Sequence, residues 1–138
     1  MPVVSSAENH EITLDDGLAR CRVWRRPDLS SEDGARCAEQ MSSSLARLAL
    51  VGSGARALAL DLSEAPGVAG PRTAAAIGSL LVSWKNSKKR AALIVGDQPL
   101  KQLQMKRIVA ENALGWAEVF PSFEQARTWL DAPPSSRR

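Results

Sequence analysis

The side chains that could do chemistry gather in one short stretch, "LDLSEAPGVAGPRTAAAIGSLLVSW", which runs from Leu60 to Trp84. Asp61 ends a predicted buried strand, a common place for functional carboxylates in open α/β sheets. Arg72 and Thr73 open the predicted helix that follows, where unpaired backbone N–H groups and the helix dipole favour an anion or an added phosphate. The stretch therefore predicts a ligand or partner site at the start of a helix.

Each of these features also has a purely structural interpretation. Thr73 could bond to a local backbone group or to water, and this interpretation is preferred to phosphorylation. Arg72 could be a solvated side chain, and the small residues between positions 67 and 78 could serve packing against the sheet instead of contact with another chain. The candidate partner-binding residues are Gly67, Gly70, Pro71, Arg72 and Thr73, and Thr73 is also the candidate phosphorylation site.

Known catalytic and metal-binding motifs are missing from the sequence. It contains no G-x-S-x-G, no P-loop and no G-x-G-x-x-G, and neither a histidine nor a second carboxylate is evident beside Asp61. His10, Cys21 and Cys37 are too few for a zinc site, which needs about four clustered ligands. A disulfide is an alternative to the two buried thiols that a cytosolic domain favours. We therefore predict no enzyme activity, no cofactor and no metal.

The bulk composition is that of one globular domain with a mild positive charge. The chain has 138 residues, of which 44% are hydrophobic and 24% charged, and its formal net charge is +3. This charge is too small to indicate nucleic acid by itself. Residues 85–90 with Lys101, Lys106 and Arg107 could form a basic patch for nucleic acid or anionic lipid, but aromatic residues for base stacking are missing apart from Trp84, so a solvated face is preferred. No apolar stretch approaches the roughly 20 residues that cross a bilayer, and the N-terminus does not have the pattern of a signal peptide. We expect a cytoplasmic protein.

Segments with the hydrophobic pattern of a β-strand alternate along the chain with segments that have the 3.6-residue period of a helix. Residues 1–9 are predicted as a flexible lead-in and 10–24 as a hairpin around "DDG", with His10 on its surface. Ser30 resembles the cap of a helix that ends near Val51. Apolar runs predict buried strands at 57–62 and 91–96, and Pro71 suits the first turn of the helix between them.

The second half of the chain continues the alternation. Asp97 can cap a third helix, and its apolar face is predicted to contain Leu100, Leu103, Ile108, Val109 and Leu114. A short strand at 117–120 and a last helix capped by Ser122 follow, and 132–138 form a disordered tail. Residues 10–131 are then one α/β domain, with a largely parallel sheet, right-handed crossovers and an antiparallel hairpin.

This order, with three landmarks, resembles the STAS domain of bacterial anti-sigma factor antagonists. The landmarks are "LALDLS", "AAAIGSLLVSWKNSKK" and "LGWAEVFPSFEQARTWL", and the likeness covers roughly residues 56–130. The resemblance implies a STAS-like fold, with a mostly parallel or mixed sheet, an N-terminal hairpin and about four helices. It also implies a role in signal transduction, in which the chain binds a regulatory kinase or an anti-sigma-like factor.

One departure from the family concerns its phosphorylation switch. Signalling members carry a D-S-S-G segment before this helix, and a partner kinase phosphorylates a serine in it. Matching Gly78 to the family's helix glycine places Ala69, Gly70, Pro71 and Arg72 at the four positions, and none has a hydroxyl or a carboxylate. The resemblance therefore implies binding without the usual switch. A carrier of a lipid or other small apolar molecule is the alternative, and a homodimer is left open.

Overall fold

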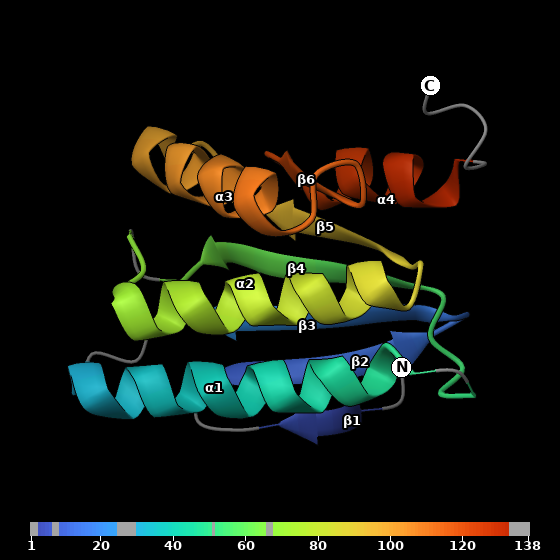
Figure 1. Cartoon of the computed structure of the whole chain (residues 1–138), viewed down its shortest axis with the longest axis horizontal. Helices are drawn as coiled ribbons and strands as arrows, with labels where there is room; N and C mark the ends of the chain where they lie inside the picture. Colours follow the sequence, from blue (N-terminus) through green and yellow to red (C-terminus); the bar gives the residue numbers. More distant parts are fainter. Residues whose placement is uncertain (1–2, 7–8, 25–29, 51, 66–67, 133–138) are drawn as a thin grey trace.

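The strands of the sheet lie side by side in the order in which they occur along the chain (Figure 1). The structure, a computed structural model, describes residues 3–6, 9–24, 30–50, 52–65 and 68–132. The elements are β1 (Val3–Ser6), β2 (His10–Asp15), β3 (Leu18–Trp24), α1 (Ser31–Leu48), β4 (Ala57–Glu64), α2 (Pro71–Asn86), β5 (Arg90–Ile94), α3 (Pro99–Asn112), β6 (Ala117–Phe120) and α4 (Phe123–Asp131).

The sheet is mixed, as predicted. Strands β1, β2 and β3 are antiparallel neighbours, and β3, β4, β5 and β6 run parallel. Leu60 of β4 lies beside Leu93 of β5, so the predicted parallel pairing of 57–62 with 91–96 is confirmed. The hairpin turns at Asp16 and Gly17, whose φ angles of 53° and 79° are those of a tight two-residue turn. The sequence predicts no strand before residue 10, yet Val3–Ser6 pair with β2.

The helices cover the two faces of the sheet unequally. In Figure 1, α1, α2 and α3 lie across one face, and α4 lies on the other. Alternation along β4 explains how one strand serves both layers, because Leu58 and Leu60 enter the larger cluster while Ala57 and Ala59 enter the smaller one. The α/β class with four helices is thus confirmed.

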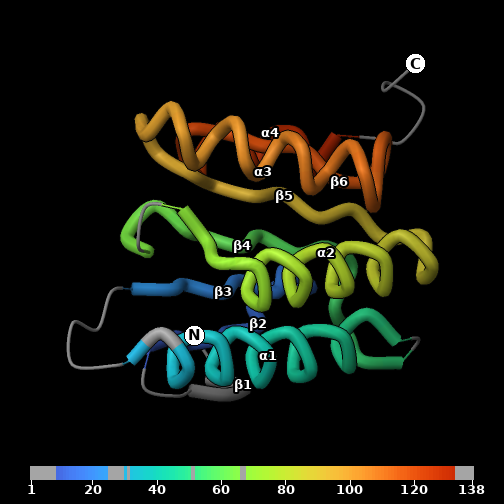
Figure 2. The backbone as a smooth tube through the Cα atoms, turned by 60° about the vertical axis from the view of Figure 1, so that its left-hand side comes forward, coloured from blue at the N-terminus to red at the C-terminus, as the bar shows by residue number. Residues whose placement is uncertain are grey.

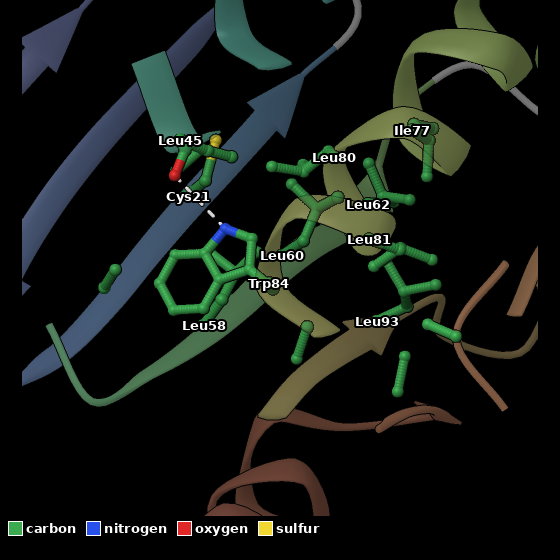
Figure 3. Packing of buried hydrophobic residues seen from close by; sticks show 14 of the residues in the cluster. Cys21, Leu45, Leu58, Leu60, Leu62, Ile77, Leu80, Leu81, Trp84 and Leu93 are labelled. Carbon is green, nitrogen blue, oxygen red and sulfur yellow. Dashed lines mark hydrogen bonds between the residues drawn. The ribbon is translucent and has the colours of Figure 1, made fainter. Parts of the chain in front are cut away.

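Two buried hydrogen bonds join α1 to α2. Trp84 of α2 is fully buried, and its Nε1 donates to the carbonyl oxygen of Leu45 at 3.1 Å (Figure 3). Ser42 Oγ of α1 donates to the carbonyl oxygen of Ala76 at 2.8 Å. A buried donor without a partner is costly, so these bonds fix how far one helix can slide along the other.

Two of the three predicted helix caps are confirmed. Ser30 Oγ accepts from the backbone N–H of Asp33 at 3.1 Å, and Ser122 Oγ accepts from that of Gln125 at 3.3 Å. The prediction for Asp97 is wrong, because α3 begins one residue later. Its N-cap is Gln98, whose side chain makes no capping hydrogen bond.

The predicted apolar face of α3 is wrong for its three leucines. Leu100, Leu103 and Leu114 are 69%, 68% and 73% exposed. The buried side of α3 consists of Lys101, Met105, Ile108 and Val109. Helix α3 carries apolar residues on both sides, so the 3.6-residue period alone does not identify the side that faces the core.

Gly78 lets α2 and α3 pack closely against each other. A Cβ built on Gly78 would lie 2.9 Å from Asn112 Nδ2 and 3.2 Å from its Cγ. Asn112 is also held in place, since its Nδ2 donates to the carbonyl oxygen of Ile108 at 2.8 Å. Gly78 therefore serves packing against α3, and not against the sheet as one of the two interpretations of the small residues had it.

We predict that Gly78→Leu lowers the free energy of unfolding by about 1–3 kcal/mol, because the added side chain must displace α3. The change can be measured by urea denaturation. Ala75→Leu on the exposed side of α2 is the matched control, and it should stay within about 0.5 kcal/mol of the wild type. Equal losses in the two variants would contradict the assignment of Gly78 to helix packing.

His10 is buried, contrary to the prediction of a surface position. Its side chain is 1% exposed, and its Nδ1 lies 3.1 Å from Asn9 Oδ1. Burial lowers the pKa of His10 below its usual 6.5, because the imidazolium form loses its water. In the unfolded chain the same ring binds a proton more readily, so protonation favours unfolding.

We therefore expect the free energy of unfolding to fall as the pH drops below about 6.5, towards the lowered pKa of the folded chain. His10 is the only histidine, so few other groups titrate in this range. Urea denaturation at about pH 8 and about pH 5.5 would measure the change. His10→Gln should flatten it, and an unchanged pH dependence in this variant would exclude His10 as the cause.

Candidate functional site

The predicted site residues lie where the chain leaves β4 and enters α2. The end of β4, the start of α2 and the start of α3 are at the same end of the molecule (Figure 2). This is the carboxyl edge of the parallel strands, where open α/β sheets most often bind ligands. Gly67 lies outside the described residues, as do the predicted tail residues 133–138.

A buried lysine from α3 fixes the start of this connection. Lys101 is 2% exposed, and its Nζ donates to the carbonyl oxygens of Leu62 at 2.7 Å and Ala65 at 2.9 Å. Burial lowers the pKa of Lys101, and the charge of Asp61 acts in the opposite direction. The interpretation of Lys101 as part of a solvated basic face is therefore wrong, because its ammonium group donates hydrogen bonds to backbone carbonyl groups inside the fold.

A second side chain of α3 fixes the other end of the connection. The amide group of Gln104 accepts from the backbone N–H of Ala69 at 2.9 Å and donates to the carbonyl oxygen of Ala69 at 2.8 Å. These two bonds satisfy the backbone of Ala69 as a neighbouring strand would. Val68, next to the clamped residue, is 54% exposed. The connection is thus held at Ala65 and Ala69 and presents an apolar side chain between them.

Helix α2 begins without a side-chain cap. Gly70 is its N-cap residue and Pro71 its first residue, and the first turn contains no acidic side chain. The first N–H groups of a helix have no partner within the helix, so they remain available to an acceptor. Thr73 lies half-buried in this turn, and Gly70, Pro71 and Arg72 are exposed.

Arg72 is engaged by a carboxylate of α1. Its Nη2 and Nε donate to Glu39 at 2.7 Å and 3.2 Å, in the paired geometry that a guanidinium favours. The hydrogen bond from Arg72 lowers the pKa of Glu39, and the same bond raises the pKa of Arg72. Both side chains remain about half exposed, so the pair contributes little to stability. The interpretation of Arg72 as a solvated side chain is therefore right about its exposure, but Arg72 also forms an ion pair with Glu39.

Asp61 belongs to the opposite face of the sheet. Its Oδ1 accepts from the backbone N–H of Ser63 at 3.0 Å and from the Ser63 hydroxyl at 2.6 Å. Its Oδ2 lies 3.9 Å from Arg20, whose guanidinium stacks 3.8 Å from the centre of the Phe123 ring. Asp61 thus holds its own strand end and neighbours an arginine, an arrangement typical of a structural carboxylate.

The structure brings Gly70, Pro71, Arg72 and Thr73 together at one helix start. The sequence reasoning did not identify the three side chains that position this start: Glu39, Lys101 and Gln104. For Lys101 a signal existed, because a single charge lies in line with Met105 and Ile108 on the buried side of α3. Nothing in the sequence pattern singled out the other two, since their partners are distant in the chain.

The fold defines the class of the protein: a small α/β domain with an N-terminal β-hairpin and a mixed sheet, compatible with a STAS-like fold. No protein-family model matches the sequence, and no curated protein matches it either. Within the described ranges, no helix is both long and apolar enough to cross a membrane. The same ranges contain no group of three or more His, Cys, Asp or Glu placed to hold a metal ion.

The lysine clamp predicts a local effect on the connection before α2. Lys101→Met keeps the length of the side chain but leaves the Leu62 and Ala65 carbonyls without their donor, so the free energy of unfolding should fall by about 1–3 kcal/mol. Backbone N–H groups of residues 65–70 should exchange with deuterium faster than in the wild type, as hydrogen-exchange mass spectrometry would show.

Lys106→Met, on the exposed side of the same helix, is the matched control and should change neither measurement. If Lys101→Met left exchange at 65–70 unaltered, Lys101 would not be the residue that holds the connection.

Proposed function

We propose that the chain is a non-catalytic STAS-like module that binds a protein partner through the 63–75 segment and the start of α2. The partner is of the kind that such modules meet, a regulatory kinase or an anti-sigma-like factor. One observation carries the proposal. Lys101 and Gln104 of α3 hold the connection between β4 and α2 by hydrogen bonds to its backbone. Its Val68 and the uncapped start of α2 are exposed. A loop held by rigid elements can bind a partner without losing much conformational freedom.

This surface combines apolar, hydrogen-bonding and charged groups that a partner could contact. Val68 offers apolar area, the first turn of α2 offers backbone donors, and Arg72 offers a charge that Glu39 already orients. An acidic or carbonyl-rich segment of a partner would complement the donors and the guanidinium. Because Arg72 is oriented before binding, a partner would not have to order it.

The proposed module works without the usual serine switch. No residue from Ala69 to Arg72 has a hydroxyl, so binding would not be controlled by phosphorylation at these positions. Thr73 is the nearest hydroxyl, and it lies in the same helical turn as Arg72. A phosphate on Thr73 would compete with Glu39 for the Arg72 guanidinium and would reverse the charge of the surface. If phosphorylation occurred there, we would expect it to weaken an acidic partner.

The alternative, binding of a small apolar ligand or lipid, has less support. The inner face of the sheet below α2 carries Leu58, Leu60 and Leu93, and the fully buried Trp84 packs into the same cluster (Figure 3). These large side chains occupy the space where an apolar ligand would have to lie. No contact among the described residues favours this alternative over protein binding.

The binding surface can be tested by charge reversal at its two ends. A partner would first be identified by co-purification from the native host and mass spectrometry. Arg72→Glu should then raise the Kd of the complex at least about ten-fold, because a like charge replaces an attractive one. Isothermal titration calorimetry would measure the Kd. Lys88→Glu, an exposed position just beyond the other end of α2, is the control and should change the Kd much less.

Glu39→Gln separates loss of the ion pair from reversal of the charge. It frees Arg72 without altering its sign, so affinity for an acidic partner should hold or rise. An affinity that only Lys88→Glu weakens would place the contact at the basic end of α2 and contradict the proposed surface.

A further inference from the structure

The end of the molecule opposite the candidate site is formed by the last turns of α1, α2 and α3 and by the connections that follow them (Figure 2). Each of these helices leads into the next parallel strand, so all three end at the amino edge of the sheet. Lys89 Nζ, after α2, donates to the carbonyl oxygen of Leu50, after α1, at 3.2 Å. The N–H of Ala91 donates to the carbonyl oxygen of Trp116, after α3, at 3.0 Å. The three connections thus form one continuous surface.

Basic side chains gather in the middle of this surface. Arg47 in the last turn of α1 and Lys85 and Lys88 at the end of α2 are exposed. None of the three forms an ion pair with a described residue. The ammonium group of Lys89 lies 5.9 Å from the centre of the Trp84 ring. Helix dipoles favour cations at such ends, so these charges alone do not indicate a function.

Two exposed leucines flank the basic side chains. Leu50 follows α1 and is 60% exposed, and Leu114 follows α3 and is 73% exposed. Helix α2 lies between α1 and α3, so its cations lie between the two leucines (Figure 1). Packed helices are about 8–10 Å apart, and the row from Leu50 to Leu114 therefore extends over roughly 20 Å. A helix dipole accounts for the cations but not for an apolar side chain on either side of them.

The backbone of Lys88 indicates that its charge has a use. Lys88 follows the C-cap residue of α2, and its φ angle of 59° lies in the left-handed region, where a helix end usually has glycine. The connections after α1 and α3 do have glycine at such angles, Gly52 at 91° and Gly115 at 87°. Backbone strain of this kind is often found at functional sites. The middle connection thus has a lysine where glycine would be less strained.

The acidic side chains at this end do not offset the cations of the helical layer. Asp15 and Glu118 alternate along their strands with residues of the larger cluster, so they belong to the face of α4. Asp131 is part of α4 itself, and Asp16 lies in the hairpin turn. Glu111 has its own ion-pair partner in the preceding turn of α3. Among the described residues, the helical side of this end is therefore basic.

We propose that this end, the amino-edge surface (Arg47, Leu50, Lys85, Lys88, Lys89 and Leu114), binds the surface of an anionic lipid bilayer. The two leucines enter the boundary between headgroups and acyl chains, and the cations meet the anionic headgroups between them. A soluble polyanion such as nucleic acid suits the cations but offers the leucines no apolar phase. A solvated face, which the sequence alone favoured, leaves both the leucines and the strained lysine unexplained.

The contact is reversible and sensitive to salt. Each basic residue near an anionic bilayer strengthens binding by about five-fold, and salt screens this attraction. The candidate partner site at the start of α2 lies at the opposite end of the same helix, so a chain bound to a bilayer leaves that site open to solution. The bilayer contact does not rest on the proposed function, and each can fail without the other.

Co-sedimentation with vesicles tests the charged part of the contact. Vesicles of phosphatidylglycerol and phosphatidylcholine in equal parts should bind the wild type, and vesicles of phosphatidylcholine alone should not. Lys85→Glu should weaken the binding at least about ten-fold, because it removes a cation and adds an anion. Lys106→Glu, at an exposed lysine midway along α3, is the matched control and should bind like the wild type. A wild type that does not bind the anionic vesicles at low salt would overturn the proposal.

The leucines test whether the surface enters the bilayer. Leu50→Asp and Leu114→Asp should each weaken vesicle binding at least about ten-fold, because a charge replaces an apolar group at the boundary. Leu103→Asp, at a 68% exposed leucine in the first half of α3, is the matched control and should bind like the wild type. Vesicle binding that both aspartates leave intact would also overturn the proposal, and equally tight binding to a DNA duplex would then assign the surface to a soluble polyanion.

Lys88→Gly separates a role in binding from a role in the fold. Glycine adopts the left-handed backbone without strain, so Tm should rise. Loss of the charge should at the same time weaken vesicle binding about five-fold. Thermal denaturation and vesicle co-sedimentation of the same variant would measure both changes. A higher Tm together with unaltered vesicle binding would contradict a bilayer contact at this end.

Discussion

The hydrogen bond from Trp84 to the carbonyl oxygen of Leu45 fixes the helical layer on which the rest of the structure depends. The indole N–H of a fully buried tryptophan needs an acceptor, and the last turn of a helix has carbonyl groups without partners of their own. Leu45 lies in the last turn of α1. One contact thus satisfies a buried donor and a helix end together, and it sets α2 against α1 at the end remote from the candidate site.

The candidate site inherits its geometry from this arrangement. With Trp84 and the Ser42–Ala76 bond fixing α2 along α1, the first turn of α2 comes to rest where Arg72 meets Glu39. Helix α3 then supplies the side-chain contacts that hold the connection between β4 and α2. It packs close to α2 at Gly78, and from that position Lys101 reaches the backbone at the end of β4. The position of the helix start is therefore set by contacts across the whole layer and not by its own loop.

Local patterns in the sequence predicted most of the fold. The runs 57–62 and 91–96 are apolar apart from Asp61, as suits parallel strands buried on both faces, and Ser30 and Ser122 carry the short-range signal of a helix cap. Helix α3 was predicted at the right position in the sequence, but its three predicted core leucines are exposed. Its leucines and its buried methionine and isoleucine are equally apolar, so only the position of α2 and the sheet decides which of them the core accepts.

Only part of the site was predicted, and the reason is related. The start of α2 at Pro71 follows from proline chemistry, but the partner of Arg72 lies on a helix many residues earlier, and that of Lys101 is a pair of carbonyl groups. Backbone acceptors leave no trace in a sequence, because every residue has one. A buried lysine is also rare enough that composition argues against it. Such contacts become visible only when the topology brings distant segments together.

The order of the strands bears on how the chain can assemble. Each strand from β2 to β6 pairs with the strand made just before it, and none of the described strands is inserted later between two others. A chain leaving the ribosome could therefore extend its sheet at one edge, one strand at a time, with each helix closing over the strand pair already formed. The parallel pairs still join strands that a whole helix separates in the sequence, and contacts of this range slow folding relative to those of a hairpin. The growing edge would at every stage be the most recent strand, so at no time would a gap in the sheet have to wait for a strand still to be made.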